Sequence, residues 1–114
     1  MSLSNSLVAK NTAPTAPDVR GSFSSSFSLV GNGTGSDITN TNGNKVGKVS
    51  PRASAIDPKL GALALNGGPT RTHALLSGSP AIDAASSADC PAKDQRGVTR
   101  PQGAGCDMGS YEKQ

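Results

Sequence analysis

Residues 65–112 read LNGGPTRTHALLSGSPAIDAASSADCPAKDQRGVTRPQGAGCDMGSYE, and this stretch contains both cysteines of the chain. Short runs of turn-forming residues recur in it, each marking a place where an extended element ends. These runs are Gly67-Gly68-Pro69, Gly78-Ser79-Pro80, Cys90-Pro91 and Arg100-Pro101. They predict an ordered but irregular segment in which turns set the path of the chain.

The composition limits the fold to one small domain with an aliphatic core. The chain has 114 residues, of which 33% are hydrophobic and only 3% aromatic, with no tryptophan. A chain of this length supports a single hydrophobic core. Because large side chains are scarce, that core must be built from Leu, Val, Ile and Ala. The 14 glycines suit the tight turns of a narrow β-structure.

The charge pattern does not favour a nucleic-acid partner or a membrane. The net charge is +3, and the basic residues are scattered without the interleaved aromatic side chains on which bases stack. No run approaches the roughly 18 apolar residues of a membrane span. The first residues also lack the basic and apolar pattern of a signal peptide. We therefore expect no nucleic-acid partner and no membrane span.

Short apolar segments recur through the first 30 residues at intervals that suit β-strands. Residues 3–10 (LSNSLVAK) place Leu3 and Leu7 on one side of an extended segment, with Asn5 interrupting the alternation. Two further strand-sized pieces follow at residues 18–21 and 22–30. The intervals, about a dozen residues or less, are too short for helical crossovers and predict strands wound around successive sides of a solenoid.

Residues 31–47 (GNGTGSDITNTNGNKVG) read as a loop rich in glycine and asparagine, in which Asn-Gly pairs favour turns with positive φ. A calcium site built on Asp37 with Asn32, Asn40 and Asn42 is an alternative interpretation. Calcium sites use several carboxylates, and this loop has one. We therefore predict no metal ion here.

Two similar segments indicate similar turns further along the chain. Ser54-Ala55-Ile56-Asp57 resembles Pro80-Ala81-Ile82-Asp83, with an Asp after an apolar Ile in each. An Asp side chain in such a place accepts hydrogen bonds from nearby backbone N–H groups. The segments therefore predict an Asx-turn at Asp57 and another at Asp83.

Three runs of the chain resemble a known bacterial pattern: NGGPTRTHALLSGSPAIDA at 66–84, CPAKDQRGVTRP at 90–101 and CDMGSYE at 106–112. They resemble the C-terminal segment of extracellular right-handed parallel β-helix repeat proteins of the choice-of-anchor Q type. The resemblance implies an all-β fold, a short right-handed parallel β-helix of two to three rungs with an irregular, disulfide-stapled C-terminal cap. Residues 1–47 would form the terminal rungs and the loop, and residues 48–114 the cap, within one structural domain.

The same resemblance implies a non-enzymatic structural module, the last rungs and cap of a bacterial surface or secreted protein. Its expected location is extracellular or at the cell surface, as part of a longer secreted protein. A cell-surface adhesion or glycan-binding module is the alternative. A remnant of a polysaccharide lyase or hydrolase is less favoured, because such enzymes need a long groove across many rungs.

Cys90 and Cys106 are the only cysteines and lie in the most turn-rich part of the chain. In an oxidising compartment they are expected to form a disulfide. Closing a loop of about 16 residues would stabilise the fold by roughly 3 kcal/mol. A closed zinc site would need further ligands, and His73 is the only histidine. We predict neither a metal site nor a cofactor.

Charged residues of both signs gather around the two cysteines. Arginine binds a carboxylate through two parallel hydrogen bonds, which would fasten a cap that has little apolar area. The alternative makes the acidic members a set for hydrolysis or metal binding. We favour the structural role and predict no catalytic residue. The predicted cap residues are Asp83, Asp94, Arg96, Arg100, Asp107 and Glu112.

The start of the N-terminal half is expected to be an open surface. A first rung without a predecessor presents a strand edge and apolar side chains to water, here Leu3, Leu7, Phe23 and Val30. Such a face invites pairing, and a two-fold contact closes by itself. We therefore expect a homo-oligomer formed through the N-terminal half, with the segment from Cys90 to Glu112 outside the contact.

Overall fold

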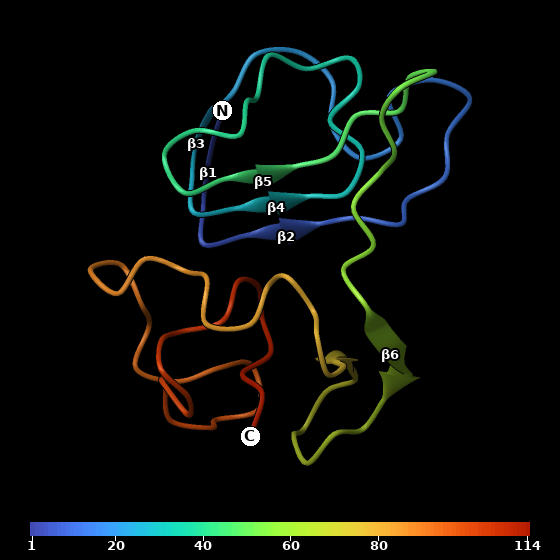
Figure 1. Cartoon of the computed structure of the whole chain (residues 1–114). Coiled ribbons are helices and arrows are strands. Elements are labelled where there is room, and N and C mark those ends of the chain that lie inside the picture. Colours follow the sequence, from blue (N-terminus) through green and yellow to red (C-terminus); the bar gives the residue numbers. More distant parts are fainter.

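Seven short β-strands and no helix make up the regular structure of the computed structural model, which describes residues 1–114. The strands are β1 (Ser2–Ser4), β2 (Leu7–Val8), β3 (Ser24–Ser26), β4 (Leu29–Val30), β5 (Lys45–Val46), β6 (Leu60–Ala64) and β7 (Thr72–Leu75). We call residues 1–57, with β1 to β5, the N-terminal unit and residues 58–114 the C-terminal unit (Figure 1). The structure has no helix of the length and apolarity that crossing a membrane requires.

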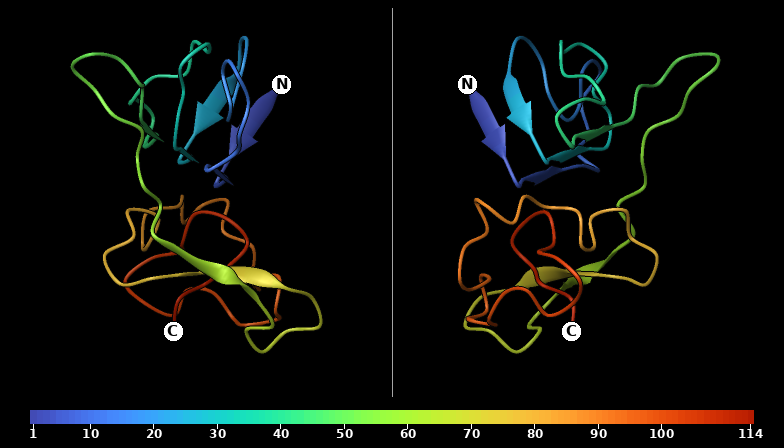
Figure 2. Two further views of the ribbon diagram at one scale, coloured as in Figure 1. Left: turned by 90° about the vertical axis from the view of Figure 1, so that its right-hand side faces the viewer. Right: turned by 60° about the vertical axis from the view of Figure 1, so that its left-hand side comes forward.

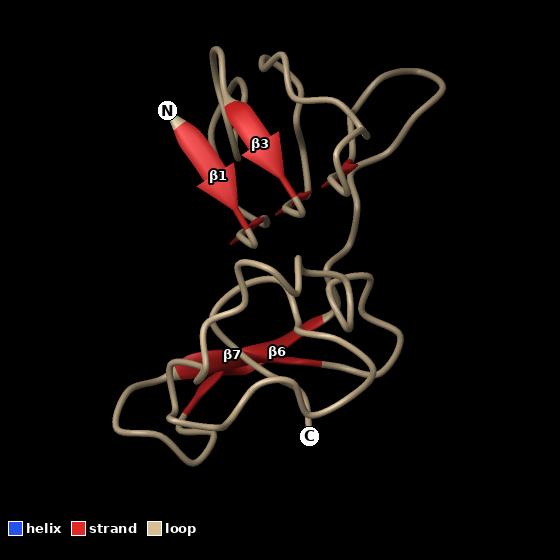
Figure 3. Ribbon diagram, turned by 90° about the vertical axis from the view of Figure 1, so that its left-hand side faces the viewer, coloured by secondary structure: helices blue, strands red, loops and turns tan.

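The N-terminal unit contains two small parallel sheets. β1 pairs with β3, and β2, β4 and β5 form a second sheet in that order. The register places Leu7 beside Leu29, and Leu29 beside Lys45. Figure 3 shows β1 and β3 side by side, each leading into a corner. The segment of β3 and β4 therefore runs parallel to the earlier segment of β1 and β2.

A residue with left-handed backbone forms the corner between one sheet and the other. Asn5 lies between β1 and β2, and Phe27 lies between β3 and β4, both with φ of 46°. A strand does not continue through this conformation, so the side chains that follow point in new directions. The segments 3–10 and 22–30, each predicted as one strand, therefore each form two.

The predicted fold, a right-handed parallel β-helix of two to three rungs, is wrong. The structure contains sheets of only two or three strands and no solenoid sheet. The cause lies in the Gly/Asn-rich loop, residues 31–47. Ser6 and Ser28, which are in contact on successive passes of the chain, are 22 residues apart, whereas Ser28 and Asn44, in contact on the next two passes, are only 16 residues apart. The shorter pass contains no third strand that pairs with β3. There, instead, the side-chain amide of Asn44 donates to the Ser25 carbonyl at 2.9 Å.

The sheet of β2, β4 and β5 separates two hydrophobic cores, which corrects the expectation of a single core. Two cores form because successive side chains of a strand point to opposite faces of the sheet. Val8 and Val30 contribute to one core, and Leu7 and Leu29 to the other. The first core contains Val19, Val30, Ile38 and Val46, with Leu3, Val8 and Phe23 packed against it. The second contains Leu29, Leu75, Ala81 and Met108. Leu29 therefore anchors the C-terminal unit on the parallel sheet.

The expected open face of the N-terminal unit is less exposed than the sequence analysis predicted. Val30 is completely buried, which corrects that part of the prediction, because β5 and the first core cover it. Leu3, Leu7 and Phe23 are half-buried. β1 and β2 do lie at the edges of their sheets, with no strand on the outer side.

The segment after β5 leads from one unit to the other. Gly47 and Gly31 approach so closely that a Cβ at Gly47 would lie 2.3 Å from the Gly31 carbonyl oxygen. The chain then forms a loop that projects from the body of the molecule, green in Figure 2, and returns at Ile56, which donates to Gly31 at 2.8 Å. It enters the C-terminal unit at β6, which pairs antiparallel with β7.

Candidate functional site

The buried carboxylates of the chain all lie in the C-terminal unit, where turns outnumber strands. Asp94, Asp107 and Glu112 are 8%, 1% and 0% exposed. The side chains of Arg96 and Arg100 are buried beside them, 3% and 4% exposed. We call these five residues the carboxylate–arginine network and treat it as the candidate functional site.

Asp94 organises the turn that follows it. Its Oδ1 accepts hydrogen bonds from the backbone N–H groups of Arg96 at 2.8 Å and Val98 at 3.0 Å. Its Oδ2 accepts from the Arg96 Nε and from the Glu112 N–H, both at 2.9 Å. An Asp side chain reaches the N–H two residues further on without strain, so the first of these bonds is a local turn contact. One carboxylate therefore satisfies three backbone donors and one guanidinium.

The Arg96 side chain connects distant segments of the unit. Its Nη2 lies 2.7 Å from Asp94 Oδ2 in an ion pair and also donates to the Glu112 carbonyl. Its Nη1 donates to the Asn66 carbonyl at 3.2 Å. The guanidinium carbon lies 3.7 Å from the centroid of the Tyr111 ring, which shields one face of the cation from water.

Arg100 and Glu112 form the second buried pair, with Arg100 Nη1 at 3.4 Å from Glu112 Oε2. The same guanidinium donates to the carbonyls of Asp107 at 2.8 Å and Gly109 at 2.7 Å. Glu112 Oε1 accepts the Gln102 N–H and its Oε2 accepts the Asp107 N–H, each at 3.0 Å. Both partners are thus bonded to the backbone as well as to each other.

Asp107 extends the network to the segment around residue 83. Its Oδ1 accepts the Asp83 N–H at 2.7 Å, and its Oδ2 accepts the Lys113 N–H at 2.6 Å. Asp83 itself is exposed, and its carboxylate accepts the Gly105 N–H at 2.9 Å instead of closing the predicted Asx-turn. The prediction for Asp57 is correct, since it accepts the Lys59 N–H two residues on.

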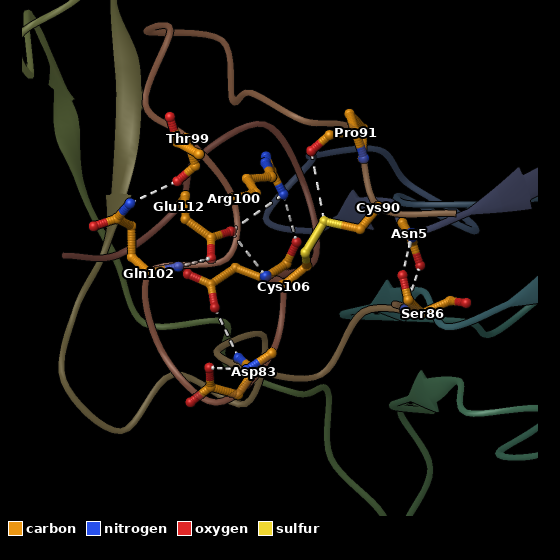
Figure 4. The surroundings of a disulfide bond; sticks show 12 residues. Asn5, Asp83, Ser86, Cys90, Pro91, Thr99, Arg100, Gln102, Cys106 and Glu112 are labelled. Carbon is orange, nitrogen blue, oxygen red and sulfur yellow. Dashed lines mark hydrogen bonds and ion pairs between the residues drawn. A yellow bond between two sulfur atoms is a disulfide. The ribbon is translucent and has the colours of Figure 1, made fainter. Parts of the chain in front are cut away.

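The predicted disulfide between Cys90 and Cys106 is confirmed. It closes a segment of 16 residues with the two Cα atoms 6.3 Å apart. Figure 4 shows Arg100 and Glu112 beside this bond. Asp94, Arg96 and Arg100 lie between the two cysteines, so the covalent bond and the network fasten the same segment.

A contact that the sequence analysis missed joins the two units at Asn5. The Asn5 side-chain amide donates to the Ser86 carbonyl at 3.2 Å, and its Oδ1 accepts the Ser86 N–H at 2.7 Å (Figure 4). Its backbone carbonyl accepts the Gly109 N–H at 2.8 Å. We call these bonds the Asn5 clasp. The only signal in the sequence is that Asn5 interrupts an apolar alternation and tolerates the left-handed backbone that it adopts.

The other candidate residues lie outside the network. His73 is exposed on β7, with its Nδ1 at 2.8 Å from the Gly61 carbonyl oxygen. Asp37 is exposed and accepts the Phe23 N–H at 2.9 Å. No group of three or more His, Cys, Asp or Glu side chains is arranged to hold a metal ion. The six predicted cap residues are connected to one another by hydrogen bonds and ion pairs. None of these bonds involves His73.

Hydrogen bonds hold the pKa of Asp94 below its ordinary value. Burial alone raises the pKa of this carboxyl and is the largest single effect. The N–H of Glu112, the Arg96 side chain and the N–H groups of Val98 and Arg96 act in the opposite direction and together outweigh burial. Asp94 is therefore ionised in the folded chain at neutral pH.

We expect acid to destabilise the fold partly through Asp94. Because the folded pKa is lowered from the ordinary 3.8, the group stabilises the fold above that value and loses its contribution as pH falls through the folded pKa. Urea unfolding at pH 6, 4 and 3 should give a falling midpoint. The Asp94→Asn variant should show a shallower fall, whereas Asp89→Asn, at an exposed position, should follow the wild type. Equal pH dependence of wild type and Asp94→Asn would contradict this assignment.

The network offers no free carboxylate oxygen to a substrate. All six oxygens of Asp94, Asp107 and Glu112 accept a backbone N–H.

No protein-family model matches the chain, and neither a curated protein nor a solved structure matches it significantly.

Proposed function

We propose that the chain is a non-enzymatic structural module of a bacterial secreted or cell-surface protein. In it the C-terminal unit covers and fastens the parallel sheet of the N-terminal unit. The observation that carries this proposal is that every oxygen of the three buried carboxylates accepts a backbone N–H. A general acid or base must reach the proton that it transfers, and these groups face the chain itself.

Two features support an extracellular location. Disulfides persist in oxidising compartments and are rare in the bacterial cytosol, and this chain closes its only two cysteines into one. The resemblance of the C-terminal runs to extracellular bacterial repeat proteins agrees with that location. Purification of the protein from its source with the disulfide intact, in the presence of a thiol-blocking reagent, would test it.

The fastening role is tested at the Asn5 clasp. We expect Asn5→Gly, which keeps the left-handed backbone accessible, to remove both side-chain bonds to Ser86. Each hydrogen bond contributes about 1 kcal/mol to the stability of the fold, so the loss of both should lower the free energy of unfolding by roughly 2 kcal/mol. Amide exchange followed by NMR should show faster exchange at Gly109 and Leu29, whose N–H groups bond to the backbone carbonyls of Asn5 and Ser6.

Asn42→Gly is the matched control for the clasp variant. Asn42 has φ of 52°, close to that of Asn5, and it is exposed. In both variants the new glycine gives the unfolded chain the same additional conformational entropy. Only Asn5→Gly also loses the contact between the units. Equal exchange rates in the two variants would show that the clasp does not fasten the units.

We also propose a homodimer formed through a groove between the two units. The groove, of about 850 Å³, is lined by 18 residues of which nine are hydrophobic, among them Leu7, Val8, Leu60 and Leu63. The open edge of β2 lies along it, and an open edge invites pairing with another strand. Met108 and Tyr111 also line this groove, so the contact would include part of the C-terminal unit, contrary to the sequence expectation.

Two leucines of the same hairpin test the dimer. Leu63 is 51% exposed and lines the groove, whereas Leu65 is 66% exposed and does not. We expect Leu63→Asp to give a monomer and Leu65→Asp to leave the dimer intact, because only the first places a charge in the contact. Light scattering at micromolar concentration measures the mass. A wild type that is monomeric throughout would refute the dimer, as would a dimer that survives Leu63→Asp.

A further inference from the structure

The loop of residues 48–55, between β5 and β6, is the longest unbroken run of exposed residues in the chain. It projects from the body of the molecule (Figure 2). None of its residues belongs to either hydrophobic core, and Val49, its largest apolar side chain, is 54% exposed. Exposed loop tips with small and polar residues are the preferred sites of proteolytic nicking. The loop therefore meets the first requirement of a cleavage site, which is access.

Few hydrogen bonds would have to break for a protease to draw this loop into an extended shape. Ser50 and Ala53 exchange two backbone bonds, of 2.9 and 3.2 Å, across a tight turn. The Arg52 N–H donates to the Ser50 hydroxyl at 3.3 Å, and the Val49 N–H donates to the Thr34 hydroxyl at 3.0 Å. All of these residues are exposed. A segment with so few bonds and no buried contact opens at a low free energy, whereas a strand or a buried turn does not.

Both ends of the loop are fixed to the body of the molecule. The Gly47 N–H donates to the Val30 carbonyl at 3.0 Å, and the Ile56 N–H donates to the Gly31 carbonyl at 2.8 Å. The loop therefore leaves and rejoins the body at adjacent points, the last residue of β4 and the residue after it. A cut at the tip would free two short ends and leave these anchoring bonds in place.

Basic side chains are the feature of the loop that a protease can select. Lys48 and Arg52 are its only charged residues, and it contains no acidic or aromatic residue. Arg52 is followed by Ala-Ser-Ala at 53–55, whose small side chains offer little steric hindrance to an enzyme. An endopeptidase of the trypsin type has an aspartate in its specificity pocket and selects bonds that follow a basic residue. The loop therefore fits this class of protease.

The other basic residues are less accessible to such an enzyme. The two arginines of the carboxylate–arginine network are buried. The second longest exposed run, residues 10–15, contains one basic residue, Lys10, whose side chain pairs with Asp57 at 3.2 Å. The Asn11 N–H, in the peptide bond that would be cut there, donates to Asp18 at 3.1 Å. The remaining basic residues are half-buried or lie in exposed runs of three residues or fewer: Arg20, Lys45, Lys59, Arg71, Lys93 and Lys113.

We propose that residues 48–55 are a processing site for an endopeptidase of trypsin-like specificity, with the bond between Arg52 and Ala53 as its main target. The reaction is hydrolysis. One water molecule is consumed, the peptide C–N bond breaks, and the new ends are the Arg52 carboxylate and the Ala53 ammonium group. Both ends lie in water at the tip of the loop, so neither new charge is buried. The products are the pieces 1–52 and 53–114.

We expect the two pieces to stay together, and this part rests on the proposed fastening role of the C-terminal unit. The disulfide lies wholly within the second piece, so no covalent bond joins the two. The Asn5 clasp and the bond from Ile56 to Gly31 do join them. In the second core, Leu29 of the first piece also packs with Met108 of the second. Processing therefore gives a two-chain protein in which only non-covalent contacts hold the pieces together.

The test is limited digestion of the folded full-length chain with a small amount of trypsin, followed by mass spectrometry and size-exclusion chromatography. We expect the first cut within residues 48–55, chiefly after Arg52. The nicked protein should elute with the intact chain and separate into its pieces only in denaturant. Lys48→Gln with Arg52→Gln should slow the loss of intact chain by at least about tenfold, which corresponds to about 1.4 kcal/mol of local opening at the remaining sites.

Arg20→Gln with Lys93→Gln is the matched control. It removes the same two charges at exposed positions outside the loop, so the intact chain should be lost at the wild-type rate. A chain that resists trypsin altogether, a first cut outside residues 48–55, or equal rates for the two double variants would overturn the processing site and leave the fastening role untouched. Pieces that separate without denaturant after a cut in the loop would overturn the two-chain protein and, with it, the proposed fastening.

Discussion

Asp94→Asn is expected to lower the free energy of unfolding by roughly 3 to 5 kcal/mol, the cost of breaking a buried ion pair by changing one partner. The side chain keeps its shape, but one oxygen becomes an N–H₂ group. Whichever way the amide turns, that group faces donors, because Oδ1 receives two backbone N–H groups and Oδ2 receives Arg96 and Glu112. The buried Arg96 cation also loses the carboxylate with which it pairs.

Urea unfolding followed by circular dichroism measures this effect, with Asp89→Asn as the control. Asp89 lies in the same unit but is exposed and forms no ion pair. Even an exposed ion pair would contribute only about 1 kcal/mol or less to the stability. The control should therefore unfold at the wild-type urea concentration. A small domain has only about 5 to 15 kcal/mol of stability in total, so the Asp94 variant should lose a large share of it and unfold at a clearly lower urea concentration than the wild type. A loss of less than about 1 kcal/mol would mean that the network is not a structural fastener.

Replacing both cysteines, as Cys90→Ala with Cys106→Ala, is expected to remove about 3 kcal/mol, the chain-entropy effect of opening a loop of this length. The disulfide closes 16 residues that hold three members of the network, so the unfolded chain gains freedom where the folded chain has little apolar contact. Urea midpoints under oxidising conditions measure the loss. Wild type treated with a reductant serves as the control and should match the double variant. Identical midpoints for oxidised wild type and the variant would contradict the expectation.

The sequence indicated where the chain turns better than how the strands pair. In residues 22–30 the apolar side chains Phe23, Phe27 and Leu29 share one parity, which predicts one strand with a single inward face. The left-handed backbone at Phe27 breaks that strand, and Phe23 and Leu29 belong to different cores. Phe27 is a residue type that rarely takes this conformation, so no local signal predicted the corner.

Leu3 and Leu7, on the two sides of the first corner, also pack against different cores. The alternation predicted that both point to one side, but Leu3 packs against the first core and Leu7 against the second. Here the sequence did carry a signal, because Asn5 interrupts the alternation and asparagine tolerates the left-handed region. The contact of Asn5 with Ser86 joins residues 81 positions apart, and nothing local indicates it.

The residue types of the candidate site were predictable, and their partners were not. Two cysteines in a turn-rich segment indicated the disulfide correctly. Arginine and acidic residues in a segment with little apolar area indicated fastening by charge. That Arg96 pairs with Asp94 and Arg100 with Glu112 follows from the turns between them, which the sequence does not specify. The missing solenoid has a similar cause, since the shortened return through residues 31–47 omits one strand.

Amide hydrogen exchange of the wild-type chain measures whether the buried carboxylates hold the fold together. The N–H groups of Val98, Asp107 and Glu112 each donate to a carboxylate of the network and belong to no strand. If the carboxylates hold the fold, these three N–H groups exchange only through global unfolding, as slowly as the N–H of Leu29 in β4. Exchange of these three amides as fast as that of the exposed residues 87–89 would contradict it.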